Sequence, residues 1–249
     1  MHVTLHRPDR LFAAFIAAGL ILGIAAPSQS VHAQTPDYAA LIAAPDRTEA
    51  DRQTDARRDP LKLLAFIGVK TGQIVLDMGA GGGYSTELMA RAVGPDGKVY
   101  AQDDKMREKF AQRGGTPAMR NVTYVIRPFD DPVPPGVHDL DVITYFFAYH
   151  DSANLPIDRG VQNRKLFEAL KPGGILVIAD HAAKAGAGTS VTGTLHRIDE
   201  DTVKAEFAAA GFRLVAEGGF FRHPEDPRDG KVFRSPVPVD EFVLKFEKP

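Results

Sequence analysis

The chain has 249 residues, of which 44% are hydrophobic and 25% are charged, as in ordinary globular proteins. This length suits one domain of moderate size with extensions. The formal net charge of -2 at pH 7 gives no general attraction to nucleic acid or to anionic membranes, so we expect no nucleic-acid partner.

The N-terminus has the pattern of a signal peptide. Two arginines precede an uncharged run of 16 residues, 11–26, which is shorter than the roughly 20 apolar residues of a membrane-spanning helix. Val31 and Ala33 then place small side chains at the spacing that signal peptidase reads. We predict a signal peptide over residues 1–33, cleavage after Ala33, export to a bacterial periplasm and no stable membrane association afterwards. The alternative is an uncleaved segment that anchors the protein in the membrane.

The region after the predicted cleavage site is polar before it becomes periodic. Residues 34–60 are rich in charge, which predicts an N-terminal arm of two or three short helices or a loosely attached segment. Residues 61–68 have the pattern of a short amphipathic helix that ends at Gly68. From there the chain alternates between strand-like and helix-like segments. The predicted strands are 73–79, 97–103, 121–126, 140–149, 174–180, 212–221 and 240–248, and the predicted helices are 84–94, 104–115, 159–170 and 199–212.

This alternation predicts an α/β fold. Apolar strands that alternate with helices form a parallel sheet with helices on both faces. The last two strands alternate in polarity, and no helical pattern separates them, so we expect an antiparallel strand pair at the C-terminal end. The expected architecture is a doubly wound, mostly parallel seven-stranded sheet.

The glycine-rich segment 79–83, which follows the first strand, predicts a ligand-binding loop. In a doubly wound sheet, ligands bind beyond the carboxyl ends of the strands, and glycine lets the backbone approach them closely. A P-loop would need Lys and then Ser or Thr after Gly83, where Tyr84 and Ser85 stand. A dinucleotide fingerprint would need glycine in place of Tyr84. S-adenosylmethionine, which has no phosphate, is the third candidate.

The segment VLDMGAGGGY resembles the first motif of class I S-adenosylmethionine-dependent methyltransferases, which Asp77, Gly79, Gly81 and Gly83 match position for position. Asp103 falls where this superfamily places its ribose-binding acid, and ALKPGGILVIAD is similar to its fifth-strand region. The resemblance implies a Rossmann-like domain over residues 61–249, an S-adenosylmethionine cofactor and methyl transfer to a small-molecule acceptor. Shorter motifs (YHD, ADH and TLHRID) resemble a group of small predicted methyltransferases that often carry signal peptides.

The resemblance also implies which residues hold the cofactor. Many class I enzymes carry an acid near the adenine just after the third strand, but Pro128 stands there, so we expect Phe129 or Asp130 to cover the adenine. One of the arginines at 52, 57 and 58 is a candidate to meet the cofactor carboxylate; otherwise these side chains form a solvated face. The cofactor-binding residues that we predict are Asp77, Gly79, Ala80, Gly81, Gly83, Tyr84, Asp103, Phe129 and Asp130.

A His–Asp pair follows each of the two central strands four and five, and these pairs predict acid–base chemistry. An acceptor hydroxyl or amine must lose a proton, and a His oriented by an Asp suits that task. The predicted catalytic residues are His150, Asp151 and His181. His196 and Arg197 extend the polar cluster. The alternative is a purely structural role, in which these side chains cap helices and form hydrogen bonds with loop backbone groups.

A divalent metal is a second use of the same cluster, with Asp151, Asp180 and His181 as ligands. The ADH segment is similar to the Asp–Asn pair of metal-dependent catechol-type methyltransferases, but the acid at strand four does not align. We therefore expect methyl transfer without a metal. Because S-adenosylmethionine is made in the cytoplasm, the alternative function is an exported, non-catalytic binding protein that keeps the methyltransferase fold.

Overall fold

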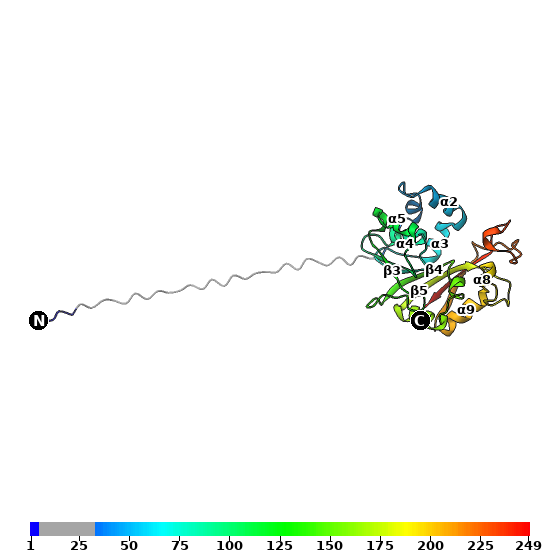
Figure 1. Cartoon of the computed structure of the whole chain (residues 1–249). Helices are drawn as coiled ribbons and strands as arrows, with labels where there is room; N and C mark the ends of the chain where they lie inside the picture. The colour runs from blue at the N-terminus through cyan, green and yellow to red at the C-terminus, as the bar shows by residue number, and fades with distance from the viewer. Residues whose placement is uncertain (5–32) are drawn as a thin grey trace. The chain divides into compact units, whose positions relative to one another are not determined.

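A seven-stranded sheet is the frame of the part of the chain that the computed structural model describes, residues 1–4 and 33–249 (Figure 1). The strands lie in the order β3-β2-β1-β4-β5-β7-β6, and β7 runs antiparallel to both of its neighbours. This confirms the predicted mostly parallel sheet and its antiparallel C-terminal strands. The strand bounds are β1 Ile74–Met78, β2 Lys98–Asp103, β3 Val122–Ile126, β4 Leu140–Phe146, β5 Leu170–His181, β6 Arg213–Gly218 and β7 Glu241–Glu247.

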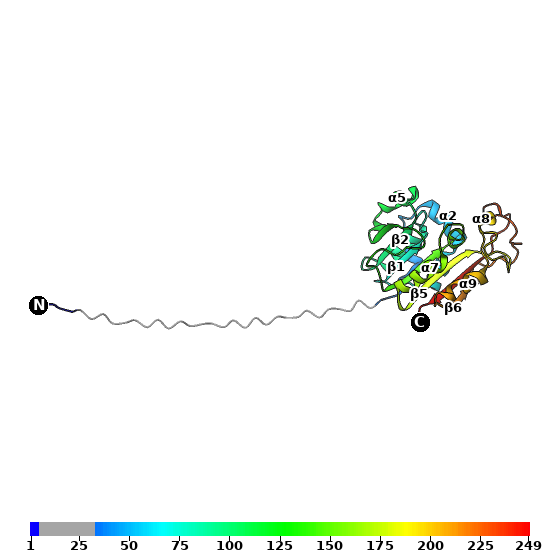
Figure 2. The ribbon, with the colours of Figure 1, turned by 60° about the horizontal axis from the view of Figure 1, so that its bottom comes forward.

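Helices cover both faces of the sheet, so side chains that alternate along each strand are buried on either side (Figures 1 and 2). Val75, for example, packs with α3 and α4, whereas Leu76 packs with α7 and α9. None of the described helices has the length and apolar composition needed to cross a membrane. The helix bounds are α1 Tyr38–Ile42, α2 Glu49–Arg58, α3 Pro60–Ile67, α4 Tyr84–Val93, α5 Glu108–Gly114, α6 Tyr149–Ser152, α7 Arg159–Ala169, α8 Thr192–Leu195 and α9 Glu200–Ala209.

The polar region 34–60 forms short helices that pack on the sheet domain. Tyr38 on α1 is buried and donates a hydrogen bond of 2.6 Å to the carbonyl of Val69. Thr48 and Asp51 form a capping box that begins α2. The predicted signal peptide falls almost entirely on residues 5–32, which lie outside the described residues.

The fourth strand ends earlier than the sequence predicts. We expected it to reach Tyr149, but β4 ends at Phe146, and Phe147 adopts a left-handed backbone conformation with φ 57°. The N–H of Phe147 donates to the carbonyl of Ala179 on the neighbouring strand β5 at 2.7 Å. This turn starts the short helix α6 and places the side chains after it at the carboxyl edge of the sheet.

A buried ion pair fixes the chain beyond β5. The side chain of Arg197 is fully buried, and its Nη1 donates to Asp226 Oδ2 at 2.7 Å and to the carbonyl of Ala182 at 3.0 Å. The following residue, Ile198, pairs with Ala182 just past the end of β5. Arg197 therefore holds α8 and its neighbouring loop against the sheet.

We expect Arg197→Met to lower the free energy of unfolding by about 3–5 kcal/mol, because Asp226 is then left as a buried, unpaired charge. Urea denaturation followed by circular dichroism measures this loss. Arg213→Met is the matched control, because the exposed pair of Arg213 with Glu247 should contribute less than about 1 kcal/mol. Equal, small losses in both variants would contradict the structural role of Arg197.

Candidate active site

The glycine loop lies between β1 and α4 and is built for close backbone approach. Gly79, Gly81 and Gly83 have φ of 62°, 55° and 80°, a region that favours glycine. A Cβ at Gly79 would lie 2.8 Å from the Cβ of Ala148, and one at Gly83 would lie 2.9 Å from the ring of Phe110. Both the conformation and the space therefore require glycine at these two positions.

The buried side chain of Asp77 stabilises the two ends of this loop. Its carboxylate is buried and accepts hydrogen bonds from Thr144 and Thr86, each at 2.6 Å, and from Ser85 at 3.0 Å. Burial raises the pKa of Asp77, and the three hydroxyl donors oppose that rise. The carboxylate thus links β1, β4 and the first turn of α4. Asp77 does not line the cleft in front of the loop, and its predicted contact with the cofactor stays a prediction.

Asp103 ends β2 and faces the loop. Its Oδ2 accepts the N–H of Gly81 at 3.1 Å, and Arg107 holds both of its oxygens, at 3.0 and 2.7 Å. Burial alone would raise the pKa of Asp103, but the hydrogen bonds from Arg107 and the neighbouring backbone outweigh it and lower that pKa. Asp103 is therefore an anionic hydrogen-bond acceptor beside the glycine loop. Arg107 was not predicted from the sequence, because Asp103 ends a strand and Arg107 precedes α5, so the two residues do not share a helix face.

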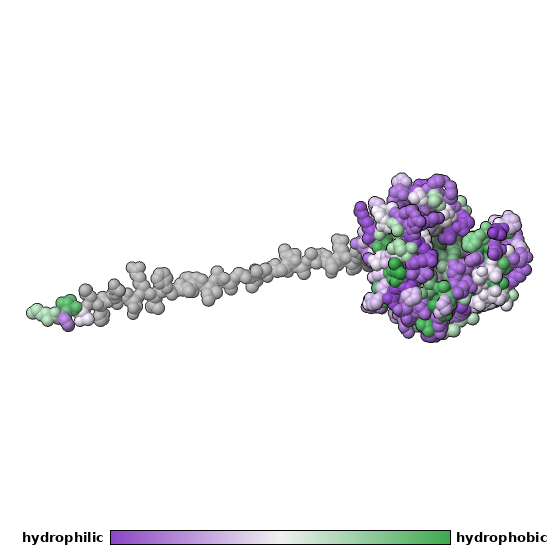
Figure 3. Space-filling view, viewed as in Figure 1, coloured by the Kyte–Doolittle hydropathy of each residue, from purple (hydrophilic) through white to green (hydrophobic). Residues whose placement is uncertain are grey.

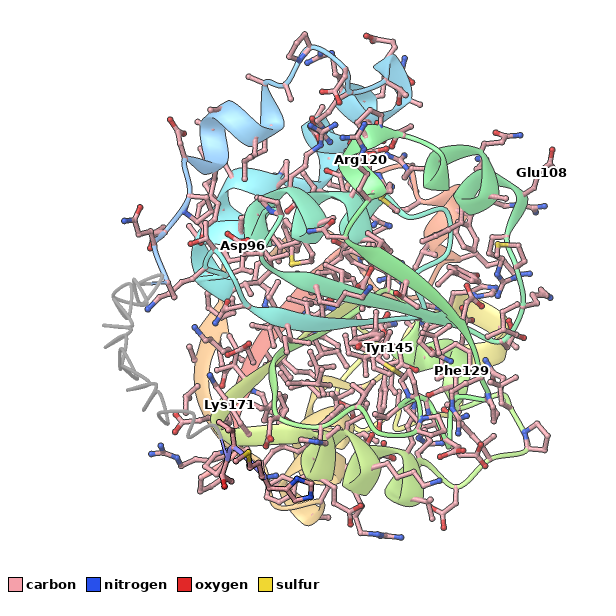
Figure 4. The ribbon with its side chains drawn as sticks, turned by 90° about the vertical axis from the view of Figure 1, so that its left-hand side faces the viewer. Asp96, Glu108, Arg120, Phe129, Tyr145 and Lys171 are labelled. Carbon is pink, nitrogen blue, oxygen red and sulfur yellow. The ribbon has the colours of Figure 1, made fainter. Side chains whose placement is uncertain are left out.

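A cleft of about 870 Å³ opens in front of the glycine loop. This volume lies in the range typical of small-molecule sites, roughly 300–1,000 Å³. Phe129 lines it and stacks on Tyr145, with ring centroids 6.3 Å apart (Figure 4). Gly83 and Asp130 do not line it. The predicted cofactor residues that line the cleft are Gly79, Ala80, Gly81, Tyr84, Asp103 and Phe129.

Helix α2 forms a wall of this cleft, and of the arginines at 52, 57 and 58 the cleft is lined by Arg57 and Arg58. Asp55 accepts a hydrogen bond of 2.6 Å from the hydroxyl of Tyr84 and pairs with the buried Arg47. Arg113 joins Asp51 at 2.6 Å and also donates to the carbonyl of Gly82 at 3.1 Å. These contacts tie the charged arm to the glycine loop, so the arm belongs to the site.

Arg58, at the end of α2, projects into the site. Its guanidinium lies 4.4 Å from the ring centroid of Phe147 and 5.7 Å from that of Tyr84. Its Nε is buried and finds no hydrogen-bond partner in the described residues. Burial lowers the pKa of Arg58 to about 10, so the side chain is still a cation at neutral pH. Of the three arginines, Arg58 is the one with a buried guanidinium nitrogen that has no hydrogen-bond partner among the described residues.

A second cavity, of about 800 Å³, lies on the other side of Arg58 and Phe147. The loop after β6 forms one of its walls, and Figure 3 shows apolar residues at the hollow between this loop and the rest of the domain. Four residues line both cavities and separate them: Arg57, Arg58, Phe147 and Asp151. Aromatic side chains of the second cavity are Phe147, Phe220, Phe221 and Phe233.

His150 lies at the base of this cavity between two carboxylates. Its Nδ1 is 2.7 Å from Asp180 Oδ1, and its Nε2 is 3.2 Å from Asp151 Oδ1. Burial alone would lower the pKa of His150, but attraction to Asp180 and hydrogen bonding to Asp151 raise it to about 10. An imidazolium in this position can donate a proton, but it must first lose one before it can accept. The predicted base role of His150 stays a prediction under that condition.

His181 forms the other histidine–carboxylate pair. Its Nδ1 lies 3.0 Å from Glu241 Oε1, although the atoms do not have hydrogen-bond geometry. Its ring packs near Phe147, at 5.1 Å between centroids, and both His181 and Glu241 line the second cavity. The sequence could not reveal Glu241, because only the antiparallel register of β5 and β7 places it opposite His181.

The three residues of the alternative metal set, Asp151, Asp180 and His181, do not converge in the described residues. Asp180 is fully buried, and its carboxylate already accepts from the ring and the backbone N–H of His150 and from the N–H of His181. His181 turns toward Glu241 instead. The side chains whose potential ligand atoms come within 4.8 Å of one another are His150, Asp151 and His196.

Comparison with known proteins agrees with the fold. A family model described as Protein-L-isoaspartate(D-aspartate) O-methyltransferase matches residues 50–113, from α2 to α5. Curated relatives include the ubiquinone/menaquinone biosynthesis C-methyltransferases UbiE of Idiomarina loihiensis, 33% identical over 131 residues, and of Cronobacter sakazakii, 35% identical over 124 residues. These alignments cover 48% and 45% of this chain and 47% and 44% of the relatives. The chain thus spans about half the length of these relatives.

Solved structures extend the likeness over most of the chain. A SAM dependent methyltransferase from Aquifex aeolicus aligns with a TM-score of 0.59 at 20% identity, over 86% of this chain and 100% of that one. Aeropyrum pernix fibrillarin, with natively bound S-adenosyl-L-methionine, aligns with a TM-score of 0.51 at 17% identity, over 75% of this chain and 74% of that one. The fold is that of the class I methyltransferase superfamily.

The contact between Asp51 and Arg113 should make the free energy of unfolding depend on pH in the acidic range. Burial would raise the pKa of Asp51, but hydrogen bonds from Arg113 and Thr48 lower it to about 2. Because this value lies below the unfolded value of about 3.9, the carboxylate stabilises the fold above that pH, and this contribution is lost as the pH falls toward 2. We expect Asp51→Asn to lower the free energy of unfolding at pH 7 by about 2 kcal/mol, with the deficit shrinking below about pH 4.

Urea denaturation of wild type and Asp51→Asn across this pH range measures the deficit. Asp46→Asn is the control, because the carboxylate of Asp46 is half exposed in its pair with Arg91 and should contribute little. A deficit for Asp51→Asn that is constant with pH would contradict this account.

Proposed function

We propose that this protein is an S-adenosylmethionine-dependent methyltransferase that acts on a small-molecule acceptor. The observation that carries the proposal is the pair of adjoining cavities, one in front of the glycine loop and one beside His181, with Arg58 and Phe147 between them. A methyltransferase needs two such sites, one for the methyl donor and one for the acceptor, that meet at the sulfonium methyl.

The first cavity suits the donor. The glycine loop can lie against its amino-acid part, Asp103 can accept hydrogen bonds from the ribose hydroxyls, and Phe129 offers a ring face to the adenine. Arg58 offers a cation for the carboxylate of the donor. These assignments use the loop after the first strand and side chains from the second strand, the loop after the third strand and the arm.

The second cavity suits an acceptor with an aromatic or apolar body and one polar nucleophilic group. In the transfer, the acceptor oxygen or nitrogen forms a bond to the methyl carbon while the bond from carbon to sulfur breaks. The sulfonium becomes a neutral thioether, and the acceptor gives up a proton. We propose His181, beside Glu241, as the group that takes this proton, because it faces the second cavity and a carboxylate lies next to its ring.

We also propose that the protein is exported and begins at Gln34 after cleavage. The backbone of Gln34 exchanges hydrogen bonds with Thr71, at 3.0 Å to the hydroxyl and 2.9 Å from the N–H. Cleavage after Ala33 would leave these contacts intact. N-terminal sequencing of exported material, which should start at Gln34, distinguishes this from an uncleaved anchor.

Asp103→Asn should weaken binding of S-adenosylhomocysteine by about 10- to 100-fold, because hydrogen bonds to a charged acceptor contribute about 1.5–3 kcal/mol. Isothermal titration calorimetry measures the change. Asp104→Asn is the control, since Asp104 also pairs with Arg107 but is half exposed. If the wild-type protein binds neither S-adenosylmethionine nor S-adenosylhomocysteine at millimolar concentration, the methyltransferase proposal fails, and the non-catalytic alternative takes its place.

Arg58→Met tests whether Arg58 binds the carboxylate end of S-adenosylmethionine. We expect about a 10- to 100-fold loss of affinity for S-adenosylhomocysteine and little change for 5′-methylthioadenosine, which lacks the carboxylate. Arg52→Met, at an exposed position of the same helix, should change neither. An equal loss for both ligands would mean that Arg58 shapes the cleft and does not contact the carboxylate.

A further inference from the structure

Three side chains meet where the two cavities adjoin. His150 Nε2 lies 3.2 Å from Asp151 Oδ1, which lies 3.6 Å from His196 Nδ1. One ligand atom from each of the three falls within 4.8 Å of the others. A tetrahedral metal with bonds of about 2.0–2.1 Å to its ligands holds neighbouring ligand atoms about 3.3 Å apart. The two measured separations lie on either side of that value.

The ring of His150 is oriented from behind by a carboxylate. Asp180 is fully buried and accepts both the ring Nδ1–H, at 2.7 Å, and the backbone N–H of His150, at 2.8 Å. This leaves Nε2 directed at Asp151. A metal bound there would replace the proton that Nε2 carries in the imidazolium. A histidine that donates one ring N–H to a carboxylate and presents the other nitrogen is the usual arrangement at metal sites.

His196 is held equally firmly by its backbone. It ends α8 in a left-handed conformation with φ 56°, and its N–H bonds to the carbonyl of Thr192 at 3.1 Å. The next residue is Arg197, whose buried ion pair anchors the segment. Nevertheless, Nδ1 of His196 is buried without a hydrogen-bond partner among the residues that the structure describes. A buried ring nitrogen of this kind requires an explanation, and a bound ion provides one.

We propose that His150, Asp151 and His196 bind one divalent transition-metal ion, of which Zn²⁺ is the best match to two imidazoles and a carboxylate. This site shares Asp151 with the metal set expected from the sequence but replaces Asp180 and His181. Three protein ligands leave a fourth position open. Because Asp151 lines both cavities, the ion would lie beside the boundary between them.

The open position gives the ion a role if the proposed methyl transfer is correct. An acceptor oxygen that binds the metal would be oriented at the boundary with the donor cleft, and the metal would make its proton easier to lose. This role rests on the proposed function. The metal site itself rests only on the three side chains and the groups that position them.

Metal binding is tested on the untagged chain, stripped with a chelator and titrated with ZnCl₂ by calorimetry and with CoCl₂ by visible absorption. We expect one ion per chain and the intense visible bands of four-coordinate Co²⁺. Asp180→Asn, which changes the carboxylate behind His150, should lower metal affinity by roughly 10- to 100-fold. His196→Ala removes a ligand, so we expect it to lower metal affinity by more than that. His223→Ala is the matched control, because His223 lines the second cavity away from the three ligands and should bind metal as wild type does.

Circular dichroism on each variant confirms that it is folded. No uptake of Zn²⁺ or Co²⁺ at micromolar concentration, or unchanged affinity in folded His196→Ala, would overturn the proposal and leave a proton-sharing network of the same residues. Titration of S-adenosylhomocysteine into the stripped and the Zn²⁺-loaded protein keeps the two proposals separate. Loss of metal binding with intact ligand binding refutes the site alone, whereas metal binding without ligand binding refutes the methyltransferase function alone.

Discussion

The buried carboxylate of Asp77 organises the functional edge of this protein. Its two oxygens accept three hydroxyl hydrogen bonds, from Thr144 on β4 and from Thr86 and Ser85 at the start of α4. A buried carboxylate is costly unless its oxygens are bonded, so these partners must be in place when the sheet forms. These bonds tie both ends of the glycine loop, which lines the first cavity, to the sheet and to α4.

The same edge collects charged groups because the parallel strands all end there. Asp103 is the last residue of β2, the α6 turn with His150 follows β4, and Asp180 is the next-to-last residue of β5. Carboxylates buried at such an edge are paired, here with Arg107, with a histidine ring or with backbone N–H groups. The arm closes the edge from the other side, since α2 supplies Arg58 and the acids that hold Tyr84 and Arg113. The cleft in front of the glycine loop therefore depends on residues before the first strand as well as on the sheet.

Part of the boundary between the two cavities is formed by the segment that follows β4. Phe147 directly follows β4 and has a left-handed backbone conformation. Its ring contacts the guanidinium of Arg58 and also lies near the ring of His181. His150 and Asp151 follow directly in the chain. Phe147 and Asp151 line both cavities, so this short segment forms part of the boundary between them. A metal held by His150, Asp151 and His196 would lie beside that boundary.

The sequence by itself determined the features that depend on neighbouring residues. Hydrophobic periodicity fixed the strand and helix order, and the glycine spacing after Asp77 identified the loop, because positive φ and close packing are local demands on the backbone. Only the tertiary structure decided which residues from distant segments contact one another. The end of β4 depends on a hydrogen bond from Phe147 to β5, and the pairing of His181 with Glu241 depends on strand register. The attachment of Asp55 to Tyr84 likewise joins segments 29 residues apart. Such contacts are set by three-dimensional packing, and no local pattern in the chain encodes them.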